Sequence, residues 1–202
     1  MHTTQDIGMV ILGRKIRMTM TVTKISYSDI DQTIFDECFN KSLSYLDATK
    51  PNIVWEEFDL TVSSSTADKL TAIKNLFQAR EGNDDYTIFK LDIDGRIVNY
   101  GCGRREQQGD RMFSHELDFF REDASGSQGW CYSFEYHKKI DAFYKSISDN
   151  CVTSSVWVVE GSSMEKSYND AVFQGWLSYT NPETLENYHG FRYKKLVVTF
   201  KV

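Results

Sequence analysis

The sequence of 202 residues predicts one α/β domain of the mixed (α+β) kind, with a central, mostly antiparallel mixed sheet flanked by helices. Three observations predict it. Two strand-like runs flank Asp94-Gly95, a dipeptide preferred in tight hairpin turns. Elsewhere, several segments repeat apolar residues at helical spacing. The strands and helices alternate too irregularly for a chain of βαβ units.

Composition limits the function classes. Hydrophobic residues make up 41% of the chain and charged residues 26%, as in ordinary globular proteins. A net charge of −6 argues against broad binding to nucleic acid. No apolar run is long enough to cross a membrane. The four cysteines lie far apart without metal-ligand spacing, so we expect reduced thiols and no metal site. A cytoplasmic or virion setting fits best.

The first strand-like alternation begins near Thr19. Residues 1–17 are therefore expected to form an N-terminal arm ahead of a single domain of residues 18–202. We expect the arm to be a flexible terminus. The alternative is that it docks on a protein partner in an assembly.

The first half of the domain alternates strands and helices. Residues 19–26 are rich in β-branched residues and predict a strand. Ser28 or Asp29 is expected to cap a helix that runs to Leu46. Residues 53–62 are a candidate strand with an acidic middle. The polar residues 63–66 then cap a second helix, whose inner face carries Leu70, Ile73, Leu76 and Phe77.

A three-strand meander follows. Residues 86–93 and 96–102 form the hairpin around Asp94-Gly95, and residues 113–121 add the third strand. A loop of small residues, 125–129, then leads into a helix over 134–147.

The final third predicts a strand, a helix and a closing strand. The apolar run 155–159 is expected to be a strand buried on both faces. Ser162 or Ser163 caps a helix to about Trp176, and Asn181-Pro182 breaks it. Residues 191–202 close the chain as a strand.

This order of elements resembles the GNAT N-acetyltransferase superfamily, from about Thr19 to the end of the chain. The resemblance is carried by four strings, which are VTKISYSDID, FKLDIDGRIVNYGCG, SSVWVVEGSSMEKSY and YHGFRYKKLVVTFKV. They resemble the opening strand and helix, the central hairpin, the late strand with its helix, and the closing strand of that family.

The resemblance implies acetyl-CoA as cofactor. In the family, the loop after the third meander strand binds the pyrophosphate, and here it would use Ser127, Gln128, Gly129 and Trp130. Gln128-Gly129 matches a frequent pair in the family. Trp130 departs from it, because large side chains stand where small ones normally let the backbone approach phosphate. In the alternative interpretation the loop is an ordinary turn and Trp130 fills the cofactor slot.

The resemblance also implies two catalytic roles. Glu116, on the third meander strand, matches the carboxylate that takes a proton from the attacking amine. Asp118 shares its strand face by two-residue periodicity. Tyr168, on the helix after the late strand, matches the tyrosine that protonates the leaving thiolate. The alternatives are two solvated acids and, among eleven tyrosines, a chance placement.

Two functions follow from these residues. The first is an acetyl-CoA-dependent N-acyltransferase acting on a small-molecule or protein amine. The second is a catalytically silent GNAT-fold binding or structural module, for example a bacteriophage virion-associated protein, with which the aromatic content of 14% is compatible. We expect no nucleic-acid or membrane partner for either.

Overall fold

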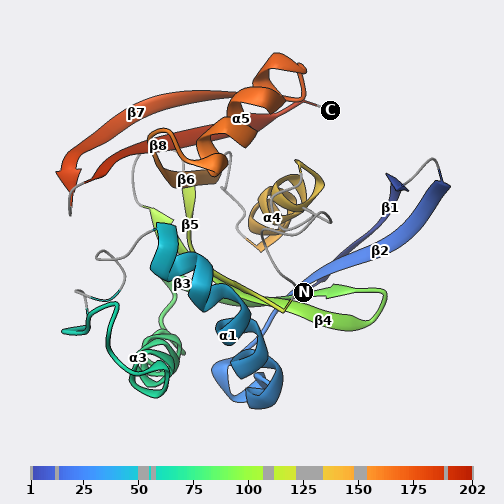
Figure 1. The fold of residues 1–202 in the computed structure, drawn as a ribbon. Coiled ribbons are helices and arrows are strands. Elements are labelled where there is room, and N and C mark those ends of the chain that lie inside the picture. The colour runs from blue at the N-terminus through green and yellow to red at the C-terminus, as the bar shows by residue number, and fades with distance from the viewer. Residues whose placement is uncertain are drawn as a thin grey trace.

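Eight strands form one sheet in the computed structural model, which describes residues 2–11, 14–49, 55, 58–106, 112–121, 134–147, 154–188 and 191–201. The sheet order is β1-β2-β3-β4-β5-β6-β8-β7 (Figure 1). Only β5 and β6 pair in parallel; the other neighbours are antiparallel. The strands are β1 (His2–Ile11), β2 (Arg14–Lys24), β3 (Tyr86–Ile93), β4 (Arg96–Glu106), β5 (Met112–Phe120), β6 (Ser154–Val159), β7 (Leu177–Tyr188) and β8 (Phe191–Phe200).

Helices cover both faces of this sheet. The helices are α1 (Gln32–Thr49), α3 (Thr66–Ala79), α4 (Phe134–Ile147) and α5 (Ser163–Phe173), with a short 3-10 turn at Tyr27–Asp29. Ile88 packs in the cluster of α1 and α3, whereas its neighbour Phe89 packs in the cluster of α4. Because successive strand residues point to opposite faces, α4 lies on the face opposite to α1 and α3. No helix among the described residues is long and apolar enough to cross a membrane.

The central hairpin is confirmed. Asp94 and Gly95 both have positive φ, 50° and 80°, as a two-residue turn between twisted strands requires. Asp94 also fixes the turn to β2, because its Oδ1 accepts from the Thr19 N–H at 2.8 Å. Three other predicted elements are confirmed: the helix after residue 65, the helix over 134–147, and the late strand.

Serine and aspartate caps set where the helices begin. The side chains of Ser65 and Ser162 accept from the Asp68 and Glu165 N–H groups at the starts of α3 and α5, as predicted. The first helix starts later than expected. Its cap is Asp31, whose Oδ1 accepts from Thr33 and Ile34 at 3.0 and 3.1 Å. Ser28 and Asp29 belong instead to the preceding 3-10 turn.

Both edges of the sheet differ from the sequence-based expectation. The expected arm, residues 1–17, supplies β1 and the first residues of β2, paired in register from His2–Thr23 to Ile11–Arg14. At the other edge, Asn181-Pro182 does not separate a helix from the last strand. It lies inside β7, where the register shifts between Thr180 and Glu183. An irregular edge strand tolerates proline because no neighbour needs its missing N–H.

The candidate strand over 53–62 is not a strand at the described positions. Trp55 is helical and completely buried. Its carbonyl accepts from the Phe58 and Leu60 N–H groups at 3.0 and 2.9 Å, which folds the chain into turns. These turns place the Trp55 ring against Phe39 of α1, with ring centroids 6.4 Å apart.

Candidate functional site

The sheet opens between β5 and β6. Within these two described strands, the parallel pairing covers only Phe113–His115 against Ser154–Val156. Further along, β5 pairs with β4 alone and β6 with β8 alone. The two strands therefore part toward their carboxyl ends, and the opening lies in the middle of the sheet.

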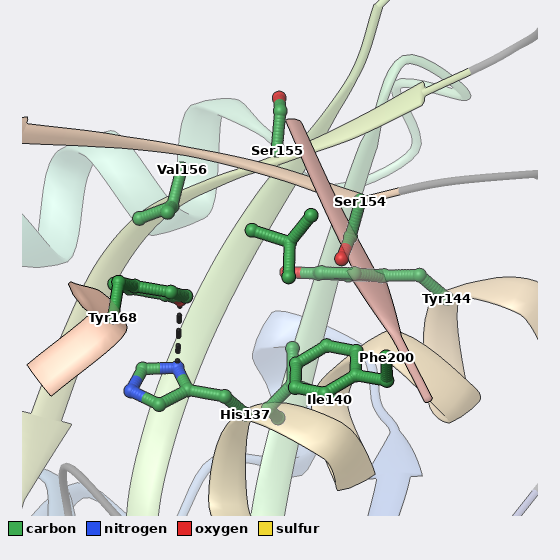
Figure 2. Close-up of a pocket in the computed structure, with 9 residues that line it drawn as sticks. His137, Ile140, Tyr144, Ser154, Ser155, Val156, Tyr168 and Phe200 are labelled. Carbon is green, nitrogen blue, oxygen red and sulfur yellow. Dashed lines mark hydrogen bonds between the residues drawn. The ribbon is translucent and has the colours of Figure 1, made fainter. Parts of the chain in front are cut away.

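Helices α4 and α5, which follow β5 and β6 in the chain, meet beside this opening. His137 comes from the first turn of α4 and Tyr168 from the second turn of α5. The Tyr168 hydroxyl lies 3.2 Å from His137 Nδ1, and Figure 2 shows this bond between the two tilted rings. The ring centroids are 5.1 Å apart. Tyr168 is only 5% exposed, so this phenol has little contact with water.

Two cavities share these two side chains. The smaller, about 20 Å³, is about large enough for one water. Its wall combines α4, β6, α5 and β8 through His137, Ile140, Tyr144, Ser154, Ser155, Val156, Tyr168, Val198 and Phe200 (Figure 2). The larger, about 390 Å³, opens along α5 and is lined by His137, Ser167, Tyr168, Asp170, Ala171, Gln174, Trp176, Leu177 and Phe200. Tyr168 therefore lies at the junction of the two cavities.

A buried carboxylate fixes α4 to the start of β6. Asp141 accepts from Ser154 Oγ at 2.7 Å and from Lys145 Nζ at 2.7 Å. Its side chain is only 6% exposed, and these bonds compensate for the lost hydration. Because Ser154 belongs to the part of β6 that still pairs with β5, this contact holds α4 at the closed end of the opening.

A charge network fixes the start of α5. Glu165 accepts from the Gly161 N–H at 2.6 Å and from Lys194 of β8 at 2.8 Å. Burial acts to raise the pKa of Glu165, but the Lys194 and Gly161 hydrogen bonds hold that pKa below its usual value. Glu165 therefore stays ionised, and it anchors the turn of α5 that precedes Tyr168.

The predicted site residues fall in three places. Tyr168 lies in the site just described. Glu116 lies in β5, at a bulge where the register passes from Cys102–Leu117 to Gly103–His115. The side chains of Glu116 and Asp118 lie outside what the structure describes, as do Ser127, Gln128, Gly129 and Trp130.

The sequence did not single out His137 as a site residue. The histidines are scattered along the chain and show no metal-ligand spacing. The available signal was the place of His137 on the first turn of the helix that follows the expected cofactor loop. Its partner lies 31 residues away, so local patterning cannot show the contact.

Solved structures share this fold, although no protein-family model and no curated protein matches the sequence. RimJ of Mycobacterium smegmatis, in complex with CoA-disulfide, matches 90% of this chain and 82% of its own at 11% identity and a TM-score of 0.57. The ribosomal-protein-S5-alanine acetyltransferase of Vibrio fischeri matches 90% and 92% at 10% identity and a TM-score of 0.56. A Salmonella typhimurium acetyltransferase that modifies the N-terminal serine of ribosomal protein L7/L12 matches 91% and 95% at 6% identity and a TM-score of 0.56.

These likenesses establish the fold, which is GNAT-like, as the sequence predicted.

Proposed function

We propose that this chain is an acetyl-CoA-dependent N-acyltransferase. The observation that carries the proposal is the opening between β5 and β6, with the buried Tyr168 phenol on a cavity beside it. A silent module of the same fold would keep the parted strands, but it would not need a buried phenol on the cavity beside them. The proposal goes beyond the fold, because one fold serves many functions.

The chemistry required of the site is acyl transfer between sulfur and nitrogen. When bound, acetyl-CoA supplies an activated acyl group on a thioester. An amine nitrogen forms a bond to the thioester carbonyl carbon, the carbon–sulfur bond breaks, and the sulfur leaves with its electron pair. The amine must lose a proton and the sulfur must gain one, so the chain needs a base and an acid.

Tyr168 is proposed as the acid. Its hydroxyl is shielded from bulk water and held in place by His137, and it lines both cavities. A positioned donor in a poorly hydrated site can pass its proton to the leaving sulfur without first displacing solvent.

Glu116 is proposed as the base. It is the next residue after His115, at which the pairing of β5 with β6 ends, and it coincides with the bulge against β4. Bulges re-aim side chains and are over-represented beside active sites. The strand geometry therefore places the Glu116 backbone at the start of the opening.

The segment Ser127–Trp130 is proposed to bind the pyrophosphate through backbone N–H groups. It precedes α4 in the chain, and a helix start favours anions. The larger cavity, at about 390 Å³, lies between the helices that flank the opening and has room for part of an extended ligand. RimJ, a structure of the same fold, contains CoA-disulfide.

The acceptor is proposed to be a protein α-amine. Two of the similar structures are described as acetyltransferases of ribosomal proteins S5 and L7/L12. Peptides that begin with serine or alanine are therefore the first acceptors to screen, followed by small-molecule amines.

Calorimetric titration tests the proposal. The purified chain is titrated with acetyl-CoA and with desulfo-CoA, and micromolar binding of both is expected. Absence of binding would refute the enzyme proposal and favour the silent module. If acetyl-CoA binds, release of free CoA thiol in the presence of each peptide identifies the acceptor.

A further inference from the structure

The contact between His137 and Tyr168 combines a hydrogen bond with a ring contact. The imidazole contacts two phenol rings: Tyr168, with ring centroids 5.1 Å apart, and its chain neighbour Tyr136, with centroids 5.2 Å apart and planes at 67°. The Nδ1 atom of this ring meets the Tyr168 hydroxyl, at 3.2 Å.

The two partners differ in their access to water. Tyr168 is buried, whereas His137 is half-buried and lines both cavities, including the larger one that opens along α5. His137 therefore lies between a buried phenol and the open cavity, and an imidazole can accept or donate a hydrogen bond there.

We propose that His137 is a positioning residue that sets the direction of the Tyr168 O–H bond through its Nδ1; this rests on the proposed function. With a neutral imidazole that carries its proton on Nε2, Nδ1 accepts a hydrogen bond from the phenol O–H and holds that O–H away from substrate. With a protonated imidazole, Nδ1–H donates to the phenol oxygen, and the phenol O–H turns into the cavity.

The proton balance of the step is closed. As the carbon–sulfur bond breaks, the phenol proton moves to the sulfur. The Nδ1 proton then moves to the phenolate oxygen, which restores Tyr168 and leaves a neutral imidazole. A proton from solvent restores the protonated imidazole before the next turnover.

Few other titratable groups surround this pair among the described residues. Helix α4 contributes Tyr136, Tyr144 and Asp141, whose carboxylate is bound by Ser154 and Lys145. Helix α5 contributes Tyr168 and Asp170. The described lining from β6, β7 and β8 carries no charge and consists of Ser154, Ser155, Val156, Leu177, Val198 and Phe200.

Nuclear magnetic resonance tests the pair without any cofactor. The full chain is labelled with ¹⁵N-histidine and with ¹³Cζ-tyrosine and is followed from about pH 5 to pH 8. The chain has four histidines, and the His137→Gln and Tyr168→Phe variants assign the two signals. We expect the Tyr168 Cζ shift to titrate with the midpoint of His137, and this titration to be lost in His137→Gln. A Tyr168 signal that ignores the His137 midpoint overturns the proposal.

Two control variants separate positioning from folding. His137→Asn keeps a polar side-chain atom near the Nδ1 position but cannot titrate, so we expect Tyr168 to stay ordered and lose its pH response. Asp170→Asn should keep the coupled titration. If Asp170→Asn abolishes it, Asp170 is the titrating partner and the proposal is wrong.

The outcome is distinguishable from failure of the proposed function. Coupled titration without acetyl-CoA binding would retain the pair and refute the acyltransferase. With an active acceptor, the pH profile of the chemical step should lose its His137-dependent limb in His137→Asn, and an unchanged profile would remove His137 from the reaction.

Discussion

The Gly103→Ala substitution probes how tightly the sheet and α4 pack beneath the site. Gly103 lies in β4, and a Cβ atom there would stand 2.6 Å from Tyr144 Cζ and 2.8 Å from its Cε1, with the hydroxyl closer still. Real Cβ contacts are essentially never below 3.0 Å, so something must move. Tyr144 is fully buried, packs against Phe89 and Phe143, and lines the smaller cavity.

The expected cost follows from that packing. Overpacking a dense core costs about 1–3 kcal/mol. For a chain of this length that corresponds to a fall in melting temperature of roughly 2–12 °C. Thermal and urea unfolding of the wild type and Gly103→Ala measure it.

A double-mutant cycle isolates the cause. Tyr144→Leu removes the ring atoms that the new Cβ meets, so the Gly103→Ala penalty should shrink by about 1–2 kcal/mol in that background. Tyr144→Phe removes the hydroxyl but keeps the ring carbons, so it should relieve only part of the Gly103→Ala penalty. Equal penalties in all three backgrounds would refute the assignment of the clash to Tyr144.

Four further outcomes are expected. Tyr168→Phe should lower the rate of acyl transfer by roughly 10²-fold or more, with little change in acetyl-CoA affinity; an unchanged rate removes it as the acid. Glu116→Gln should slow turnover at neutral pH without weakening cofactor binding. Equal steady-state rates for the variant and the wild type would exclude Glu116 as the base. Gly129→Trp should abolish calorimetric binding of acetyl-CoA at an unchanged melting temperature, and retained binding would exclude the loop. Burial raises the pKa of Cys38 from 9.0 to about 12. The unfolded chain loses this proton first, so the free energy of unfolding should fall as pH rises above about 9. In Cys38→Ala, the free energy of unfolding measured with urea should fall less between pH 8 and pH 10 than in the wild type.

Local signals determined much of the fold. Asp94 and Gly95 adopt positive φ because the turn between twisted strands requires it, and the dipeptide alone predicts this. Ser65 and Ser162 cap the helices that follow them through contacts only three residues long. The apolar faces of α3 and α4 also follow from spacing within one helix.

Only the tertiary structure decided the edges of the sheet and the site. Residues 2–11 become a strand because β2 offers hydrogen-bonding groups, and Pro182 is tolerated in β7 because that strand lies at an edge. The parting of β5 and β6 after three pairs, and the meeting of His137 with Tyr168, depend on how distant segments pack. The sequence by itself determined the hairpin and the caps of α3 and α5, because each is encoded within a few residues, whereas Tyr168 is a candidate acid only through the family resemblance. The opening and the partner of that acid depend on contacts between residues far apart in the chain, and only the folded chain brings these together.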